Sequence, residues 1–159
     1  AQVRVYSRHN TNLEAFVGRM RALVPVDMVA CDTAEDDVAH ADIAILATNA
    51  GMPVIDPAAL CGVAHVTTVG PKFLDSHELP LEAVADRLLV SDSPQQIRDQ
   101  GVRHMLHGHP RSDDIKHLGE SLIHGRSDGL RQSLYLSAGL AGTEVVALDT
   151  ALSYLAAHR

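Results

Sequence analysis

One stretch of the sequence, Ala41–Val54, constrains the fold more than any other. Five apolar residues, 43–47, follow one another without a gap, and the polar turn Thr48–Gly51 closes the run. A short apolar run closed by a turn is typical of a strand buried on both faces, as in a parallel sheet covered by helices. Open α/β sheets bind ligands just beyond the carboxyl ends of their strands. Thr48 and Asn49 are therefore candidates for the floor of a nucleotide pocket, and an ordinary polar turn is the alternative.

Strand and helix patterns alternate along the chain, which is typical of an α/β fold with a parallel sheet. The strands are expected at Gln2–Tyr6, Val26–Ala30, Ala41–Ala47, Ala64–Val69, Arg87–Val90 and Ser133–Ser137. The helices are expected at Thr11–Val24, Thr33–Ala39, Pro94–His104, Asp113–Ile123 and Thr143–His158, with a helical turn at Asp56–Leu60.

Composition and charge exclude several classes of partner. A chain of 159 residues, of which 46% are hydrophobic, can bury the core of one domain. The net charge of −7 argues against binding to nucleic acid or to an anionic membrane, and no apolar run approaches the roughly 20 residues of a membrane span. Cys31 and Cys61 lie in neither a CxxC nor a zinc pattern, so we expect reduced thiols and a cytoplasmic location.

A group of histidines raises the question of a metal site. Zinc sites need firm ligand spacing and partners that orient the ligands, whereas the segment 108–110 has the pattern of a loop. We therefore expect no metal site here, but solvated loop histidines. The histidines concerned are His104, His107, His109, His117 and His124.

The turn after the first predicted strand, Ser7-Arg8-His9, contains no acidic residue. In dinucleotide-binding folds an acid near this position selects NAD, whereas an arginine accommodates the 2′-phosphate of NADP. Arg8 can form a bidentate pair with a phosphate, and Ser7 and His9 can assist it. The turn therefore predicts selection of NADP(H); a solvent-exposed arginine at a strand end is the alternative.

The glycine-rich GxGxxG turn that a Rossmann domain needs between its first strand and first helix is absent from this sequence. If Gln2–Tyr6 is the second Rossmann strand, the first strand and its phosphate loop lie upstream of Ala1 or come from elsewhere. The first strand is central in the 3-2-1-4-5-6 order. Without it, the facing edges of its two neighbours are unpaired, at about 1–3 kcal/mol for each buried backbone group. The expected fold is a Rossmann-like doubly wound parallel sheet that lacks the first strand and the glycine-rich loop.

The sequence resembles the NAD(P)-binding domain of the ornithine cyclodeaminase/μ-crystallin family over nearly its whole length. The segments that carry the resemblance are, in order, VRVYSR, ADIAILATNAGMPVID, HVTTVGP with His77-Glu78-Leu79, LLVSDSPQQ, HLGE and SLYLSAGLAGTEV. The resemblance implies that residues 1–159 form a Rossmann-like NAD(P)-binding domain, as a portion of a larger two-domain chain. In that family the upstream domain binds the substrate and forms a homodimer.

The resemblance also implies a function, namely hydride transfer between NAD(P) and the α-carbon of a small amino or imino acid. Family members include ornithine cyclodeaminases, ketimine or pyrroline-carboxylate reductases, and amino-acid dehydrogenases. Arg8 favours NADPH-dependent reduction of an imino acid, and NAD-dependent ornithine cyclodeamination is the close rival. A non-catalytic NADP(H)- or small-ligand-binding protein of crystallin type is the alternative of a different class. The family's substrate-binding basic residues belong to the upstream domain, so we expect this chain alone to be inactive.

The resemblance assigns cofactor contacts residue by residue. Ser7, Arg8 and His9 match the turn at the adenosine ribose. The matches nearer the nicotinamide are Ala47, Thr48 and Asn49 at a strand end, Val69 and Gly70 in the VG pair, and Ser137.

The sequence departs from the family pattern at Lys72, in the segment VGPKFLDSHEL. Many cyclodeaminases carry an acid two residues past the VG pair, where it assists the amine chemistry. A lysine cannot act as the same carboxylate base, but desolvation can lower its pKa and make it a base of another kind. It can also pair with a substrate carboxylate or lie exposed in a loop, and Asp75 is the other acid near this position. Lys72 is thus the candidate catalytic residue.

Overall fold

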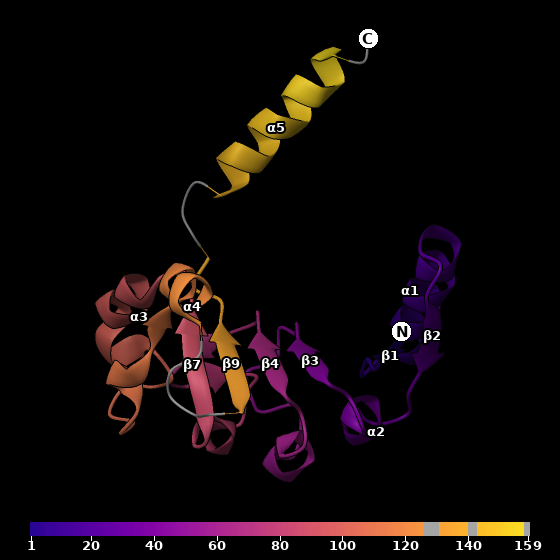
Figure 1. The fold of residues 1–159 in the computed structure, drawn as a ribbon. Helices are drawn as coiled ribbons and strands as arrows, with labels where there is room; N and C mark the ends of the chain where they lie inside the picture. Colours follow the sequence, from indigo (N-terminus) through magenta and orange to yellow (C-terminus); the bar gives the residue numbers. More distant parts are fainter. Residues whose placement is uncertain (126–130, 140–142, 158–159) are drawn as a thin grey trace.

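The strands form two separate parallel sheets and a small antiparallel hairpin in the computed structural model, which describes residues 1–125, 131–139 and 143–157 (Figure 1). The smaller sheet pairs β1 (Gln2–Val5) with β2 (Asp27–Ala30). The larger sheet has the order β3 (Ile43–Leu46), β4 (His65–Thr68), β9 (Gln132–Leu136), β7 (Arg87–Ser91) and β8 (Lys116–His117). The hairpin consists of β5 (Lys72–Phe73) and β6 (Ser76–His77).

Helices connect most of these strands, which confirms the predicted α/β class. Two helix starts follow from local chemistry, because the Thr33 hydroxyl accepts from the Asp36 N–H (3.0 Å) and the Ser93 hydroxyl accepts from the Gln96 N–H (3.3 Å). The α-helices are α1 (Asn10–Leu23), α2 (Ala34–Val38), α3 (Pro94–Gln100), α4 (Leu118–His124) and α5 (Thr143–Ala157). The 3₁₀ turns are η1 (Pro57–Leu60), η2 (Leu81–Val84), η3 (Gly101–Arg103) and η4 (Ser112–Asp114).

Two of the predicted helices differ clearly in their bounds. The helix expected at 94–104 ends at Gln100, because Gly101 has φ +52°, a left-handed conformation that ends helices. The helix expected at 113–123 is divided into η4, the short strand β8 and α4. The last helix, expected to reach His158, is described to Ala157, and His158 lies outside the described residues.

The core lies against one face of the larger sheet. Val66 of β4, Leu134 and Leu136 of β9 and Leu89 of β7 are fully buried in it. Residues from α2, η1, η2, α3 and the segment 104–106 pack on the same face, so short elements cover it together. This packing fixes the positions of the strand ends that the next subsection describes.

The prediction that residues 43–47 form a strand buried on both faces is wrong. Ala44 and Leu46 of β3 face the core, whereas Ile43 and Ile45 are 61% and 66% exposed. The physical reason is that the core elements pack on the face that carries Ala44 and Leu46, and the second face of β3 points away from them. An apolar run by itself cannot distinguish a strand with two covered faces from one with a single covered face.

The expected unpaired edges are confirmed within the described residues. There β1 pairs only with β2, and β3 pairs only with β4, so the two sheets are not joined. Figure 1 shows β1 and β2 to one side of β3, with α5 extending away from the larger sheet. No helix in the part of the chain that the structure describes is long and apolar enough to cross a membrane.

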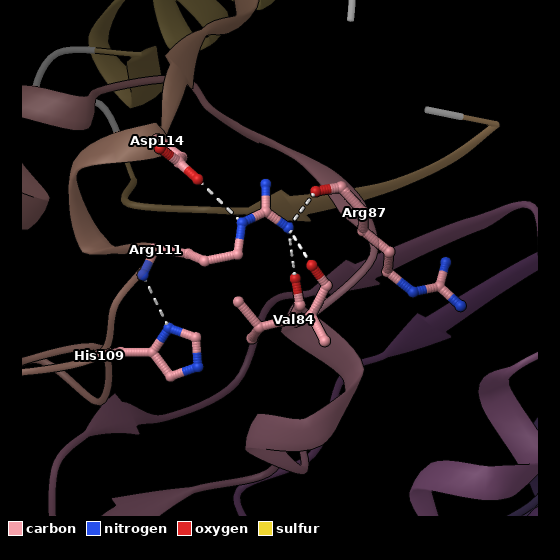
Figure 2. A network of polar contacts seen from close by, with 6 residues as sticks. Val84, Arg87, His109, Arg111 and Asp114 are labelled. Carbon is pink, nitrogen blue, oxygen red and sulfur yellow. Dashed lines mark hydrogen bonds and ion pairs between the residues drawn. The ribbon is translucent and has the colours of Figure 1, made fainter. Parts of the chain in front are cut away.

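Arg111 holds the loop after α3 against the turn before β7 (Figure 2). Its guanidinium donates to the carbonyl oxygens of Val84 (2.8 Å), Ala85 and Arg87 (2.8 Å), and it pairs with Asp114 (2.9 Å). These three backbone carbonyl groups thus receive a charged donor, which stabilises both segments.

Candidate functional site

The carboxyl ends of the central strands meet at one edge of the larger sheet, because these strands are all parallel. Backbone bonds link neighbouring ends: the Val69 N–H donates to the Leu46 carbonyl (2.9 Å), and the Ser137 N–H donates to the Thr68 carbonyl (3.3 Å). We call this region the carboxyl edge and define it by the residues at or just beyond the strand ends: Thr48, Asn49, Thr68, Val69, Gly70, Asp92 and Ser137.

Glu78, which is completely buried, joins two of these strand ends. Its Oε2 accepts from the Thr48 N–H (2.7 Å) and the Thr48 hydroxyl (2.8 Å). Its Oε1 accepts from the Thr68 hydroxyl (2.8 Å) and the Gly70 N–H (2.6 Å). Hydrogen bonds to a carboxylate are short and strong, so this side chain fixes the β3 and β4 ends relative to each other.

Gly70 is required by the close approach of this carboxylate. A Cβ atom built on Gly70 would overlap the Thr48 carbonyl oxygen and would lie 2.5 Å from Oε2 and 2.6 Å from Cδ of Glu78. The peptide N–H of Gly70 is used by Glu78, and its carbonyl oxygen accepts from Lys72.

Lys72 begins β5, immediately beyond the carboxyl edge, and is partly buried there. Its Nζ donates to the Gly70 carbonyl oxygen (2.7 Å). Burial lowers the pKa of Lys72, while the nearby carboxylates of Glu78 and Asp92 act in the opposite direction. The lysine therefore sits where its protonation depends on the charges of the edge.

His104 lies next to Lys72 and is almost fully buried, at 3% exposure. Its Nδ1 accepts from the Leu106 N–H (3.2 Å), so the neutral ring carries its proton on Nε2, which has no hydrogen-bond partner among the described residues. Burial, and secondarily the Lys72 charge, lower the pKa of His104 to about 4.

This histidine should make stability depend on pH. The unfolded chain protonates His104 near pH 6.5 and the folded chain only near pH 4, so stability falls as the pH falls through that window. The slope is at most about 1.4 kcal/mol per pH unit. In His104→Asn, whose amide oxygen can still accept from Leu106, we expect a shallower slope in urea unfolding between pH 6.5 and 4. The exposed His107→Asn serves as the control; equal slopes for His104→Asn and the wild type would contradict the assignment.

Asp92 organises the segment after β9. Its Oδ1 accepts from the Ala138 N–H (2.7 Å) and its Oδ2 from the Gly139 N–H (3.1 Å). Burial, with Asp92 as a second cause, raises the pKa of Tyr135, whose side chain also lies beside Ser137. Asp92, the first residue beyond β7, thus holds the two residues that follow Ser137.

The structure places the predicted cofactor residues in two groups. Ala47, Thr48, Asn49, Val69, Gly70 and Ser137 all lie at the carboxyl ends of β3, β4 or β9, and Gly70 bonds to Lys72. Ser7, Arg8 and His9 follow β1 in the smaller sheet and are not brought to the same edge. Arg8 and His9 are exposed, and the Ser7 hydroxyl accepts a long hydrogen bond from the His9 N–H (3.4 Å).

Sequence reasoning gave no role to Glu78, Asp92 or Tyr135. Its expectation of a solvated loop histidine is wrong for His104, which is 3% exposed. Glu78 and Asp92 do lie within the segments that carry the family resemblance. The described histidines bond locally instead of clustering, since the Nδ1 atoms of His109 and His117 accept from the Arg111 and Gly119 N–H groups. Within the described ranges no group of three or more His, Cys, Asp or Glu side chains could hold a metal ion.

Comparison with known proteins assigns the family. The model of the ornithine cyclodeaminase/mu-crystallin family matches residues 1–153. The chain belongs to this family. It is 26% identical over 148 residues to the ketimine reductase mu-crystallin of Rattus norvegicus, covering 92% of this chain and 45% of that protein. The resemblance inferred from the sequence is thereby confirmed.

Solved structures of the same fold support the assignment. The Thermococcus litoralis Δ¹-pyrroline-2-carboxylate reductase, solved with NADH and L-proline, has a TM-score of 0.73 and 25% identity, covering 96% of this chain and 51% of that one. The iminosuccinate reductase of Paracoccus denitrificans, solved with NAD⁺, has a TM-score of 0.78 and 19% identity, covering 99% and 49%, which shows the fold alone. The present chain spans about half the length of these relatives.

Proposed function

We propose that this chain is the NAD(P)-binding part of an enzyme that transfers hydride between a nicotinamide cofactor and the α-carbon of a small amino or imino acid. The observation that carries the proposal is the family match over residues 1–153. The relative from Thermococcus litoralis was solved with NADH and L-proline, which supports this cofactor and substrate class. The substrate-binding upstream domain and the homodimer of the full protein belong to the same proposal, and a cytoplasmic location stays a prediction.

The residues present fit the two ends of such a cofactor. Arg8 presents an exposed guanidinium in a turn without an acid, which suits the 2′-phosphate of NADP(H). Asn49 and Val69 are exposed at the carboxyl edge, which suits the nicotinamide end. When bound, the cofactor supplies the hydride acceptor or donor, and the residues of this chain orient it and exclude water.

A strand inserted between β1 and β3 would join the two sheets. Both facing edges belong to parallel sheets and are unpaired in the described residues. In a Rossmann sheet the strand at this place leads into the glycine-rich loop that binds the pyrophosphate. We therefore place the pyrophosphate site on that strand's loop and treat residues 1–159 as one portion of a two-domain protein.

Calorimetric titration with NADPH and NADH tests the cofactor proposal. We expect tighter binding of NADPH, and a loss of about 10- to 100-fold in NADPH affinity for Arg8→Ala, because a charge-assisted pair with phosphate contributes about 1.5–3 kcal/mol. Affinity for NADH should change little, and Arg19→Ala, an exposed cation on α1 beside Phe16, is the matched control. Equal affinities for both cofactors would contradict the NADP(H) preference.

The same titration in a longer chain separates two explanations of weak binding. If this chain binds neither cofactor but a chain extended upstream does, the inserted strand is required. If neither chain binds NADPH or NADH, the cofactor proposal is refuted.

Lys72 favours one alternative function, a non-catalytic NADP(H)- or small-ligand-binding protein of crystallin type. It stands where many cyclodeaminases carry an acid, so it cannot supply the same carboxylate base. In the catalytic proposal, Lys72 instead exchanges a proton with the substrate nitrogen or pairs with the substrate carboxylate. Turnover of the full-length protein with NADPH and Δ¹-pyrroline-2-carboxylate decides: oxidation of NADPH supports the enzyme, and binding without oxidation of NADPH with this or other imino acids supports the alternative.

A further inference from the structure

We propose that Glu78 is the positioning residue of the carboxyl edge: it orients the Thr48–Ala50 turn and holds the charged Lys72 side chain in place. The proposal rests on the proposed function, because it assigns Lys72 and this turn to the cofactor and substrate site. It adds a residue that touches neither cofactor nor substrate and acts through its hydrogen-bond partners.

The Glu78 carboxylate uses several of the hydrogen-bond donors at the carboxyl edge. Four hydrogen bonds reach the Glu78 carboxylate, two on each oxygen, from Thr48, Thr68 and Gly70. A carboxylate accepts and does not donate, so only a side chain of this type satisfies all four donors. These donors are consequently unavailable to a bound cofactor, and Thr48 and Gly70 contribute to the site through their placement.

Through Thr48, the hydrogen bonds of Glu78 extend to the exposed part of the carboxyl edge. The Thr48 hydroxyl that donates to Glu78 also accepts from the Ala50 N–H (3.2 Å). The intervening Asn49 is exposed. Glu78 therefore sets the orientation of the Thr48 hydroxyl, which in turn fixes the backbone that presents Asn49.

Through Gly70, the hydrogen bonds of Glu78 extend to Lys72. Glu78 accepts from the Gly70 N–H (2.6 Å), and the Gly70 carbonyl accepts from Lys72 Nζ (2.7 Å). Two further titratable groups face Lys72: the Asp92 carboxylate beyond β7, and the His104 ring after η3, which is neutral. Glu78 thus contributes both a geometric link and a negative charge to the lysine.

A purely space-filling role does not explain a charge at this position. Glu78 is completely buried, and within the described part of the chain no ion pair to its carboxylate is found. Burying a carboxylate is costly unless its hydrogen bonds are satisfied, and an apolar side chain would fill the same volume at lower cost. Buried polar groups of this kind specify a unique geometry.

The experiment uses the fact that the chain contains two lysines, Lys72 and Lys116. With lysine labelled at Cε with ¹³C, NMR follows each ammonium separately as the pH is raised, and the exposed Lys116 is the internal reference. In Glu78→Gln we expect the Lys72 midpoint to move to lower pH by on the order of one unit, because a nearby negative charge is lost. Glu82→Gln, an exposed acid on η2, removes the same charge and should leave the midpoint unchanged.

The second readout is NADPH affinity, measured by titration well below the unfolding temperature of each variant. We expect Glu78→Gln to bind NADPH about 10-fold or more weakly, since small displacements of a binding edge have large effects. An unchanged Lys72 midpoint in a folded Glu78→Gln variant would overturn the proposal and leave Glu78 with a structural role. If neither the wild-type chain nor the chain extended upstream binds NADPH, the proposed function fails, while the lysine titration still decides the role of Glu78.

A second pair of variants applies if Glu78→Gln does not fold. Thr48→Val removes the hydroxyl that links Glu78 to Ala50, and Thr48→Ser restores it. We expect the Ala50 amide to exchange with solvent at least several-fold faster in Thr48→Val and to recover in Thr48→Ser. Equal exchange in both variants would overturn the proposed link.

Discussion

Replacement of Gly70 by alanine is expected to destabilise the chain by about 3 kcal/mol or more. Forcing extra atoms into a packed site costs about 1–3 kcal/mol, and each hydrogen bond broken at a buried charged group adds about 1–3 kcal/mol. The added Cβ would meet the Thr48 carbonyl oxygen and the Glu78 carboxylate, and neither is the free end of a flexible side chain. Urea unfolding of the variant and the wild type measures the difference.

A matched glycine separates this local effect from the general effect of losing glycine. Gly18 lies inside α1, and a Cβ there meets nothing within 4 Å. Gly18→Ala should therefore stabilise the chain by about 0.5–1 kcal/mol, as expected for alanine in a helix interior. If the Gly70→Ala variant is as stable as the wild type, the Thr48 carbonyl and the Glu78 carboxylate can move away from the added Cβ atom at little cost, which would contradict this prediction.

Replacement of Arg87 by methionine is expected to cost about 3–5 kcal/mol, because each buried carbonyl group that loses its donor costs about 1–3 kcal/mol. Arg87 is 3% exposed, and its guanidinium donates to the carbonyl oxygens of Leu60 (2.5 Å), Val63 (2.9 Å) and Ser133 (3.4 Å). These bonds connect Leu60 at the end of η1, Val63, and Ser133 of β9 through one side chain of β7. Methionine fills much of the volume but leaves the carbonyl groups without donors in a buried place.

The control is Arg98→Met on the exposed side of α3. Among the described residues the Arg98 guanidinium bonds only to Gln95 on its own helix (3.1 Å), so its loss should change stability by about 0.5 kcal/mol or less. The urea midpoints of the two variants should therefore differ clearly. A cost for Arg87→Met below about 1 kcal/mol would mean that water replaces the guanidinium at these carbonyl groups.

Much of the fold could be predicted from local patterns. The strands at β1, β3, β4, β7 and β9 and the starts of α2 and α3 lie within about two residues of their predicted places. The short hairpin β5–β6 and the strand β8 were missed, because two-residue strands carry no periodic signal. Lys72, Thr48 and Gly70 were found as candidates, but the sequence offered no way to connect them.

The sequence by itself determined the alternation of strands and helices, the capping residues and the family motifs, because each depends on neighbours within a few residues. Only the tertiary structure decided which face of β3 is buried and which groups Glu78 and Arg87 contact. Glu78 meets Thr48 across 30 positions, and Asp92 meets Ala138 across 46. Such contacts follow from the strand order β3-β4-β9-β7, in which parallel pairing brings the carboxyl ends of segments far apart in the chain to one edge.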